Sequence, residues 1–280
     1  MSSGRAIGND RPSLHMRLHS GMGGGIRRIM FTKSARYYDA IYAKKDYAGE
    51  AAKLRTLISS KIQREARTLL DVACGSGRHL AELKAAFEIE GVDLNDDLLA
   101  LARARLPDVR FHHGDMRSFD LGRTYDVVSC LFSAIGYVTS VADLNAAIGA
   151  MARHVAPGGL LIVEPWWPPD NWVVDGKPRI QFANEPDVKI ARMSMSGREN
   201  AIAIVDLHYL VGSQEGIAYF TEQHRFGLFT IDEHLTAFRT AGLEVTHDPV
   251  GLMGRGLYTG LKPPRKQARR RKAPPATETA

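Results

Sequence analysis

Cysteine is scarce in this sequence, with only Cys74 and Cys130 among 280 residues. Two thiols are too few for a disulfide framework, and they lack the short spacing that metal centres show. We therefore expect both thiols to be free and predict no metal site.

Long apolar runs are also missing. No window approaches the roughly 18 consecutive apolar residues of a membrane-spanning helix, although hydrophobic residues make up 44% of the chain. The first 25 residues lack the apolar centre of a secretory signal. These absences predict a globular cytoplasmic protein without a membrane partner. Its length suits one large domain, or one domain with a lid.

Basic charge is in excess, but it is confined to one end. The net charge is +6, and residues 262–280 account for all of it with seven basic residues and one acidic residue. Because the rest is neutral, nucleic acid is not expected as a partner. Residues 263–280 are interpreted as a disordered basic tail, or alternatively as a tail that binds an anionic partner. Residues 1–29 lack periodicity and are expected to be a disordered extension or to lie upstream of the true start.

From Leu69 onward, short apolar runs alternate with helical patterns. Helices are expected to begin at Arg78, Asp96 and Ala142, between the runs "LLDVA", "FEIEGVD", "VRFHHGD", "YDVVSCLF" and "GLLIVEP". Strands that alternate with helices are joined by crossovers and form a mostly parallel sheet with helices on both faces. The sequence therefore predicts a doubly wound α/β domain.

The pattern changes after Pro165. Residues 166–226 begin with a loop rich in Pro and Trp and continue with three alternating segments joined by "GREN" and "GSQEG", which favours an inserted antiparallel β lid. An exposed edge of these strands could pair two chains into a homodimer. Residues 227–262 return to the main domain, with a helix capped by Thr230 and Glu233 and a final antiparallel pair of strands.

The stretch "ACGSG" ends the first core strand, so Gly75 and Gly77 could bring the backbone close to a ligand. A simple packing turn is the alternative. A dinucleotide site would have a third glycine where this chain has Leu80, which weakens the pyrophosphate interpretation. Asp93 and Asp115 end the next two strands, where carboxylates could accept hydrogen bonds from a ribose and from an adenine amino group. A ribose and an adenine without phosphates describe S-adenosylmethionine.

Several motifs resemble, in order and spacing, those of class I S-adenosylmethionine-dependent methyltransferases: "LLDVACGSGRHL", "GVDLNDDLLALAR", "GDMRSFDL", "YDVVSCLFSAIGYV" and "APGGLLIVEP". The resemblance implies a Rossmann-like, seven-stranded sheet and S-adenosylmethionine as the cofactor. It also implies a set of cofactor-binding residues. These are Ala73, Gly75 and Gly77 around the amino-acid portion, Asp71 toward the ammonium group, Asp93 and Leu94 at the ribose, and Asp115 and Met116 at the adenine.

Both ends of the domain resemble more closely the enzymes that N,N-dimethylate nucleotide-linked amino-deoxysugars in antibiotic biosynthesis. The similar segments include "YYDAIYAKKDYAGEA", "CLFSAIGY" and "GRGLYTG". The resemblance implies that Tyr42 contacts the substrate and Tyr47 the cofactor. An aromatic helix face packed on the domain is the alternative for this segment. Tyr137 stands where those enzymes carry a histidine.

The expected reaction is N-methylation of a nucleotide-linked amino sugar by in-line methyl transfer. Another amine or hydroxyl acceptor is the alternative, and an RNA methyltransferase is disfavoured because "CLFSAIG" replaces the Pro-Pro-aromatic loop. The candidate catalytic residues are Tyr42 and Tyr137 as positioners, Glu164 as an acceptor and His224 as a base. The candidate substrate-binding residues are Trp166 and Trp167, which could stack on a ring, and Arg255, which could clamp a phosphate. Structural alternatives are an exposed strand histidine, tryptophans that anchor the loop, and a solvated arginine.

Overall fold

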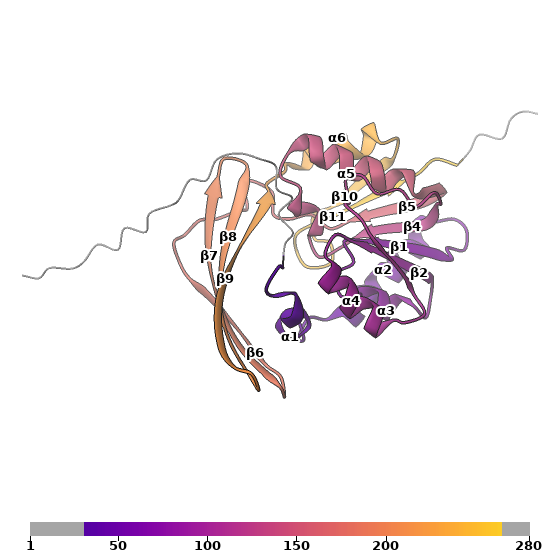
Figure 1. The fold of residues 1–280 in the computed structure, drawn as a ribbon. Coiled ribbons are helices and arrows are strands. Elements are labelled where there is room, and N and C mark those ends of the chain that lie inside the picture. The colour runs from indigo at the N-terminus through magenta and orange to yellow at the C-terminus, as the bar shows by residue number, and fades with distance from the viewer. Residues whose placement is uncertain (1–30, 265–280) are drawn as a thin grey trace, which may run out of the picture.

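Residues 31–264 are described by a computed structural model, in which two β-sheets lie on either side of a short N-terminal segment (Figure 1). The expected disordered segments, residues 1–29 and 263–280, fall outside this range except for residues 263 and 264. The larger sheet has the strand order β10-β11-β5-β4-β1-β2-β3. Its strands are β1 (Thr68–Val72), β2 (Glu88–Asp93), β3 (Arg110–His113), β4 (Tyr125–Cys130), β5 (Val155–Val163), β10 (Glu244–Asp248) and β11 (Leu257–Leu261).

The seven-stranded sheet is mostly parallel, as predicted. Strand β1 pairs in parallel with β2 and β4, and these pair in parallel with β3 and β5. Strand β11 runs antiparallel to both β5 and β10, which confirms the expected final pair. The order of strands reverses between β1 and β4, and in open α/β sheets such a switch point is where ligands bind.

Helices cover both faces of this sheet (Figure 1). In strand β1, Leu69 packs with three helices on one face, whereas Leu70 and Val72 pack with two helices on the other. The first face carries α2 (Tyr47–Lys61), α3 (Arg78–Leu83) and α4 (Asp96–Arg105), and the second carries α5 (Val141–Arg153) and α6 (Ile231–Thr240).

Local capping explains where two of these helices begin. The Asn95 side chain accepts a hydrogen bond from the Leu98 amide at the start of α4. At the start of α6, Thr230 and Glu233 form the predicted capping box, in which each side chain accepts from the other residue's amide. Within residues 31–264, no helix has both the length and the apolarity that crossing a membrane requires.

A second, antiparallel sheet lies between β5 and α6 in the chain. Its strands, in order, are β6 (Arg179–Asn184), β7 (Val188–Glu199), β8 (Ile202–Ser213) and β9 (Gly216–Gly227). The sequence predicts only the last three, because "RIQFAN" of β6 is short and half polar and follows a Pro-rich loop. The outer face of this sheet exposes Ile180, Phe182, Met193, Leu210 and Tyr219.

The inner face of the smaller sheet is covered by the N-terminal segment. This segment contains a 3₁₀ turn, η1 (Ala35–Tyr37), and the short helix α1 (Tyr38–Ile41). Tyr37 and Ile41 pack with Leu207 and Tyr209 of β8 in one buried cluster. The segment therefore lies between the two sheets, beside the switch point of the larger one.

Candidate active site

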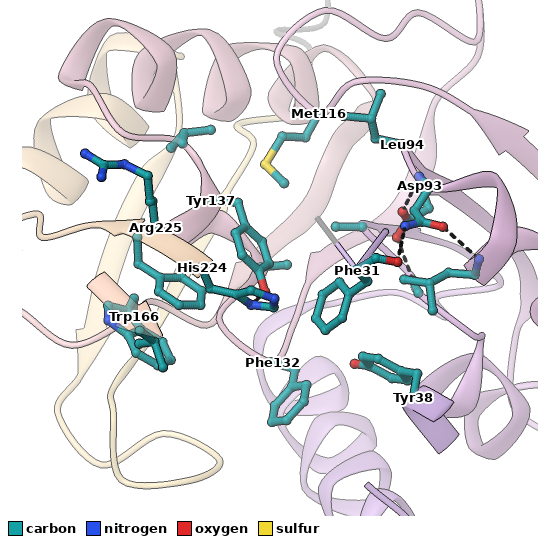
Figure 2. A pocket seen from close by; sticks show the side chains of 18 of the residues that line it. Phe31, Tyr38, Asp93, Leu94, Met116, Phe132, Tyr137, Trp166, His224 and Arg225 are labelled. Carbon is teal, nitrogen blue, oxygen red and sulfur yellow. Dashed lines mark hydrogen bonds between the residues drawn. The ribbon is translucent and has the colours of Figure 1, made fainter. Parts of the chain in front are cut away.

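A cavity of about 630 Å³ lies where the switch point, the N-terminal segment and the smaller sheet meet (Figure 2). Residues from all three parts of the fold line it. One wall comes from the loops that follow β1, β2 and β3, and the opposite wall comes from β7, β8 and β9 together with the segment after β4. The cavity therefore has two unlike walls, and their chemistry differs.

Asp93, at the carboxyl end of β2, is the charged group of the first wall. Its Oδ2 atom accepts a hydrogen bond of 2.8 Å from the Gly75 amide, and its Oδ1 atom accepts one of 2.8 Å from the Asn95 amide (Figure 2). Burial raises the pKa of Asp93, although the backbone hydrogen bonds oppose this. The carboxylate is thus fixed by the backbone while it faces the cavity, where it can accept further hydrogen bonds from hydroxyl groups.

The two glycines of "ACGSG" have different roles. Gly75 lines the cavity, and a Cβ atom placed there would come no closer than 3.9 Å to the Tyr38 hydroxyl. Gly77 does not line the cavity, and a Cβ atom there would lie 3.3 Å from that of Ala102 on α4. Both glycines have positive φ, and so does Ala73, which also faces the cavity. Gly75 and Ala73 therefore shape the ligand side of the loop, whereas Gly77 allows the loop to pack closely on α4.

Asp115 and Met116 follow β3 and line the same wall. Arg117 binds the Asp115 carboxylate through Nη2 at 2.6 Å, which holds that side chain in place. Leu94 also lines this wall. Asp71 lies behind the wall instead: it is 2% exposed, and its Oδ1 atom accepts a hydrogen bond of 2.7 Å from Ser129 on β4.

Tyr47 lies at the start of α2 and is not part of the cavity wall. Its ring packs against His79, and the Arg78 guanidinium lies 4.8 Å from the ring centre. The Tyr47 hydroxyl is buried and has no hydrogen-bond partner among residues 31–264. A buried hydroxyl in this state is costly unless a ligand group completes it.

Tyr137 and His224 are brought together in the second wall. The Tyr137 hydroxyl lies 3.1 Å from His224 Nδ1, and both side chains line the cavity (Figure 2). His224 is only 4% exposed, so it is not the exposed strand histidine considered as the alternative. Burial raises the pKa of Tyr137, so this phenol stays neutral and acts as a hydrogen-bonding group.

Glu164, at the end of β5, supports the loop after β4. Its Oε2 atom accepts a hydrogen bond of 2.7 Å from the Phe132 amide, while Ser133 donates to the Pro165 carbonyl at 2.6 Å. Phe132 and Ser133 both have positive φ, which is uncommon for residues other than glycine. The Glu164 side chain is fully buried and does not line the cavity. Its position suits a support for the loop that carries Phe132 into the cavity.

Two arginines of the cavity wall differ in their partners. Arg255 Nη2 lies 3.7 Å from Glu164 Oε1, so its charge is balanced by a carboxylate. Arg192 on β7 donates to the Tyr42 hydroxyl at 3.2 Å and also to the Gln181 side chain. Among residues 31–264, no carboxylate oxygen lies within 4 Å of the Arg192 guanidinium.

The tryptophans of the Pro-rich loop have separate positions. Trp166 lines the cavity and stacks on Phe226, with ring centres 4.1 Å apart. Trp167 is half-buried and lies outside the cavity wall. Trp172 donates to the Gly197 carbonyl at 2.9 Å, which anchors the loop to β7. One of the two expected substrate-stacking tryptophans therefore faces the cavity.

Sequence reasoning missed several cavity residues, chiefly Phe31, Tyr38, Phe132, Arg192 and Phe226. Tyr38 could have been found, because it stands four residues before Tyr42 on the same helical face. Phe31 could not, because its place depends on the tertiary fold: its ring lies 4.8 Å from His224 and 5.3 Å from Tyr38 (Figure 2).

Comparisons with known proteins agree with this geometry. A family model described as a methyltransferase domain matches residues 69–159. The dTDP-3-amino-3,6-dideoxy-alpha-D-glucopyranose N,N-dimethyltransferase of Streptomyces fradiae is 42% identical over 87% of this chain and 96% of its own length. The dTDP-4-amino-2,3,4,6-tetradeoxy-D-glucose N,N-dimethyltransferase of Saccharopolyspora spinosa is 38% identical over 81% of this chain and 92% of its own.

A solved structure shows the same fold. It is an amino pentose methyltransferase of Micromonospora echinaspora, involved in calicheamicin biosynthesis and bound to S-adenosylmethionine. It is 38% identical to this chain, covers 85% of it and 99% of its own length, and gives a TM-score of 0.73. These similarities extend over both sheets and both walls of the cavity. The chain therefore belongs to the S-adenosylmethionine-dependent methyltransferases, within the family of the amino-sugar N-methyltransferases.

Proposed function

We propose that this protein adds two methyl groups to the amino nitrogen of a sugar carried on a nucleoside diphosphate. The observation that supports this most directly is the similarity of nearly the whole chain, smaller sheet included, to dTDP-amino-sugar N,N-dimethyltransferases. The smaller sheet supplies the second wall of the cavity. A relationship that includes this sheet therefore concerns the acceptor side of the site as well as the cofactor side.

The first wall fits S-adenosylmethionine. Asp93 offers a fixed carboxylate for ribose hydroxyls, and Gly75 leaves open space beside it for the amino-acid portion. Asp115 and Met116 would adjoin the adenine. The Tyr47 hydroxyl has no hydrogen-bond partner among residues 31–264, but it lies outside this wall and does not support the assignment. When bound, S-adenosylmethionine supplies an electrophilic methyl group on a positively charged sulfur.

The chief task of the second wall is to hold the acceptor nitrogen in line. Alignment of reacting groups can contribute about 7 to 11 kcal/mol, whereas a positioned base adds about two to four decades in rate. Tyr42 and Tyr137 place hydroxyl groups at the cavity, and each can accept a hydrogen bond from an amine. The rings of Phe31 and Trp166 exclude water around this position. We therefore assign positioning to the tyrosines and proton acceptance to His224.

Arg192 supports a substrate that carries phosphate. It lines the cavity without a carboxylate partner in the described part of the chain, next to Ser194 on the same face of β7. Arg255 is less suited, because Glu164 already balances its charge. A guanidinium binds phosphate oxygens through two parallel hydrogen bonds, so the diphosphate of a nucleotide-linked sugar would lie along β7.

The test is methyl transfer to defined acceptors. Purified protein would be incubated with S-adenosylmethionine and, separately, a dTDP-3-amino sugar, a dTDP-4-amino sugar and the same sugars without the nucleotide. Mass spectrometry should show one and then two added methyl groups on a nucleotide-linked sugar and far slower transfer to the free sugar. Efficient methylation of an amino acid, alcohol or aglycone, with every nucleotide sugar left unchanged, would overturn the proposal.

A further inference from the structure

Strand β9 carries a carboxylate, Glu222, that has no role in the site described above. Glu222 and His224 stand two residues apart, so both side chains project from the same face of the strand. Glu222 Oε2 lies 3.5 Å from His224 Nε2, and the Glu222 side chain is 8% exposed. Nε2 is buried and makes no hydrogen bond within residues 31–264. A largely buried carboxylate therefore lies within 4 Å of this nitrogen.

Glu222 is held in place from the other side by the N-terminal segment. Its Oε2 atom accepts a hydrogen bond of 2.6 Å from the Ser34 hydroxyl, and its Oε1 atom accepts from the amides of Lys33 at 2.7 Å and Ser34 at 3.1 Å. Burial works against ionisation of Glu222, but the adjacent His224 ring and the hydrogen bonds from Ser34 and Lys33 outweigh it and lower the pKa to about 2. The carboxylate is thus charged and immobile.

We propose that Glu222 is a positioning residue for methyl transfer, which sets the tautomer of His224 and through it the direction of the Tyr137 hydroxyl. A carboxylate beside Nε2 favours a proton on that nitrogen, which leaves Nδ1 as an acceptor. The Tyr137 hydroxyl then donates to Nδ1, and the lone pairs of its oxygen face the cavity. Glu222 itself does not line the cavity.

This inference rests on the proposed function. Within that function, it assigns a role in proton transfer to the series Tyr137, His224 and Glu222. Methyl transfer to an amine leaves an ammonium, which must lose a proton before a second methyl group can be added. That proton passes from the nitrogen to the Tyr137 oxygen, while the Tyr137 hydroxyl proton passes to His224 Nδ1. The resulting imidazolium is stabilised by the Glu222 carboxylate, and the proton leaves to solvent when the product departs.

The inference is tested by Glu222→Gln, which keeps the size of the side chain but removes its charge. We expect kcat to fall about tenfold or more, because proton acceptance is impaired, with the KM for the sugar and the affinity for cofactor within a few fold. The share of singly methylated product should rise. The matched control is Glu215→Gln in the β8–β9 turn, where the side chain is 82% exposed, and it should leave kcat unchanged.

A double-mutant cycle separates positioning from general damage. If Glu222 acts through Tyr137, Glu222→Gln should add little to the loss caused by Tyr137→Phe, because both changes break the same chain. The inference is refuted if the double variant loses kcat by the product of the two single-variant factors. It is also refuted if the Glu222→Gln protein is as active as the Glu215→Gln control. Should Glu222→Gln fail to fold, Ser34→Ala loosens the same carboxylate and should give a smaller loss of kcat.

A spectroscopic measurement tests the inference without any methyl acceptor. Nitrogen-15 spectra of the cofactor-bound protein, with His224 assigned by comparison with His224→Gln, report which ring nitrogen carries the proton. We expect Nε2–H in the unmodified protein and a mixture of tautomers in Glu222→Gln. A proton on Nδ1 in the unmodified protein would refute the inference whatever substrate is used. Absence of methyl transfer to any nucleotide sugar, with the expected tautomer present, would instead refute the proposed function.

Discussion

Replacement of Asp71 by asparagine should change the stability of the cofactor-free protein in a pH-dependent way. Asp71 is 2% exposed, and its one hydrogen bond described in the structure comes from Ser129. Burial is the main cause that raises its pKa, from an ordinary value of 3.8 to about 6. The carboxylate is therefore costly to ionise inside the folded domain, and asparagine removes that cost while it can still accept the Ser129 hydrogen bond.

The size of the effect follows from the pKa difference. A difference of roughly two units corresponds to about 3 kcal/mol. The folded state holds this proton more tightly than the unfolded chain does. The stability that the folded protein gains by keeping Asp71 protonated is therefore fully present below pH 3.8 and is lost as the pH rises toward about 6. The Asp71→Asn protein does not lose stability in this pH range. Its buried amide N–H groups, however, lower the free energy of unfolding by about 1 to 3 kcal/mol at every pH.

The measurement is urea unfolding of both proteins without cofactor. Between about pH 4.5 and about pH 7.5, the stability of Asp71→Asn relative to the unmodified protein should rise by about 2 kcal/mol. Equal destabilisation at both pH values would show that Asp71 is not an uncompensated buried charge, and the reasoning would fail.

Three further substitutions test other parts of the site. Asp93→Ala should weaken cofactor binding by about 1.5 to 3 kcal/mol for each hydrogen bond lost, as calorimetry would show; wild-type affinity would place the ribose elsewhere. Gly77→Ala should lower the free energy of unfolding by about 1 to 2 kcal/mol, because φ is +74° and Ala102 lies close; an unchanged melting temperature would contradict this. Arg192→Leu should raise the KM for the nucleotide sugar about tenfold or more in steady-state kinetics, with cofactor affinity unchanged; an unchanged KM would exclude a phosphate contact.

The strands of the main sheet could be predicted because their physical cause is local. Buried parallel strands are apolar along their whole length, so "LLDVA" and "GLLIVEP" stand out from the helices between them. Strand β6 could not be predicted, because "RIQFAN" lies at the edge of the smaller sheet and exposes both Ile180 and Phe182. Such a segment is defined by its pairing with β7 and not by its own composition.

For a similar reason, the residues of the first cavity wall were more predictable than those of the second. Asp93 is the last residue of β2 and Asp115 lies two residues after the end of β3, and parallel strands bring their carboxyl ends to one edge. The hydrogen bond between Tyr137 and His224 joins residues 87 positions apart, and only the tertiary fold creates it. The position of Asp71 behind the wall was equally hidden, because its hydrogen bond to Ser129 depends on the pairing of β1 with β4.

The origin of the two cavity walls in separate sheets has a consequence for how such enzymes diversify. Under the proposed function, recognition of the methyl donor would depend on the loops that follow β1, β2 and β3, whereas contact with the acceptor would fall largely to residues of β7, β8 and β9. Exchanging those few strand positions, or grafting a relative's hairpin, should redirect regiochemistry among amino sugars without disturbing donor affinity. Evolution and protein engineers can thus adjust one specificity while the other is inherited unchanged.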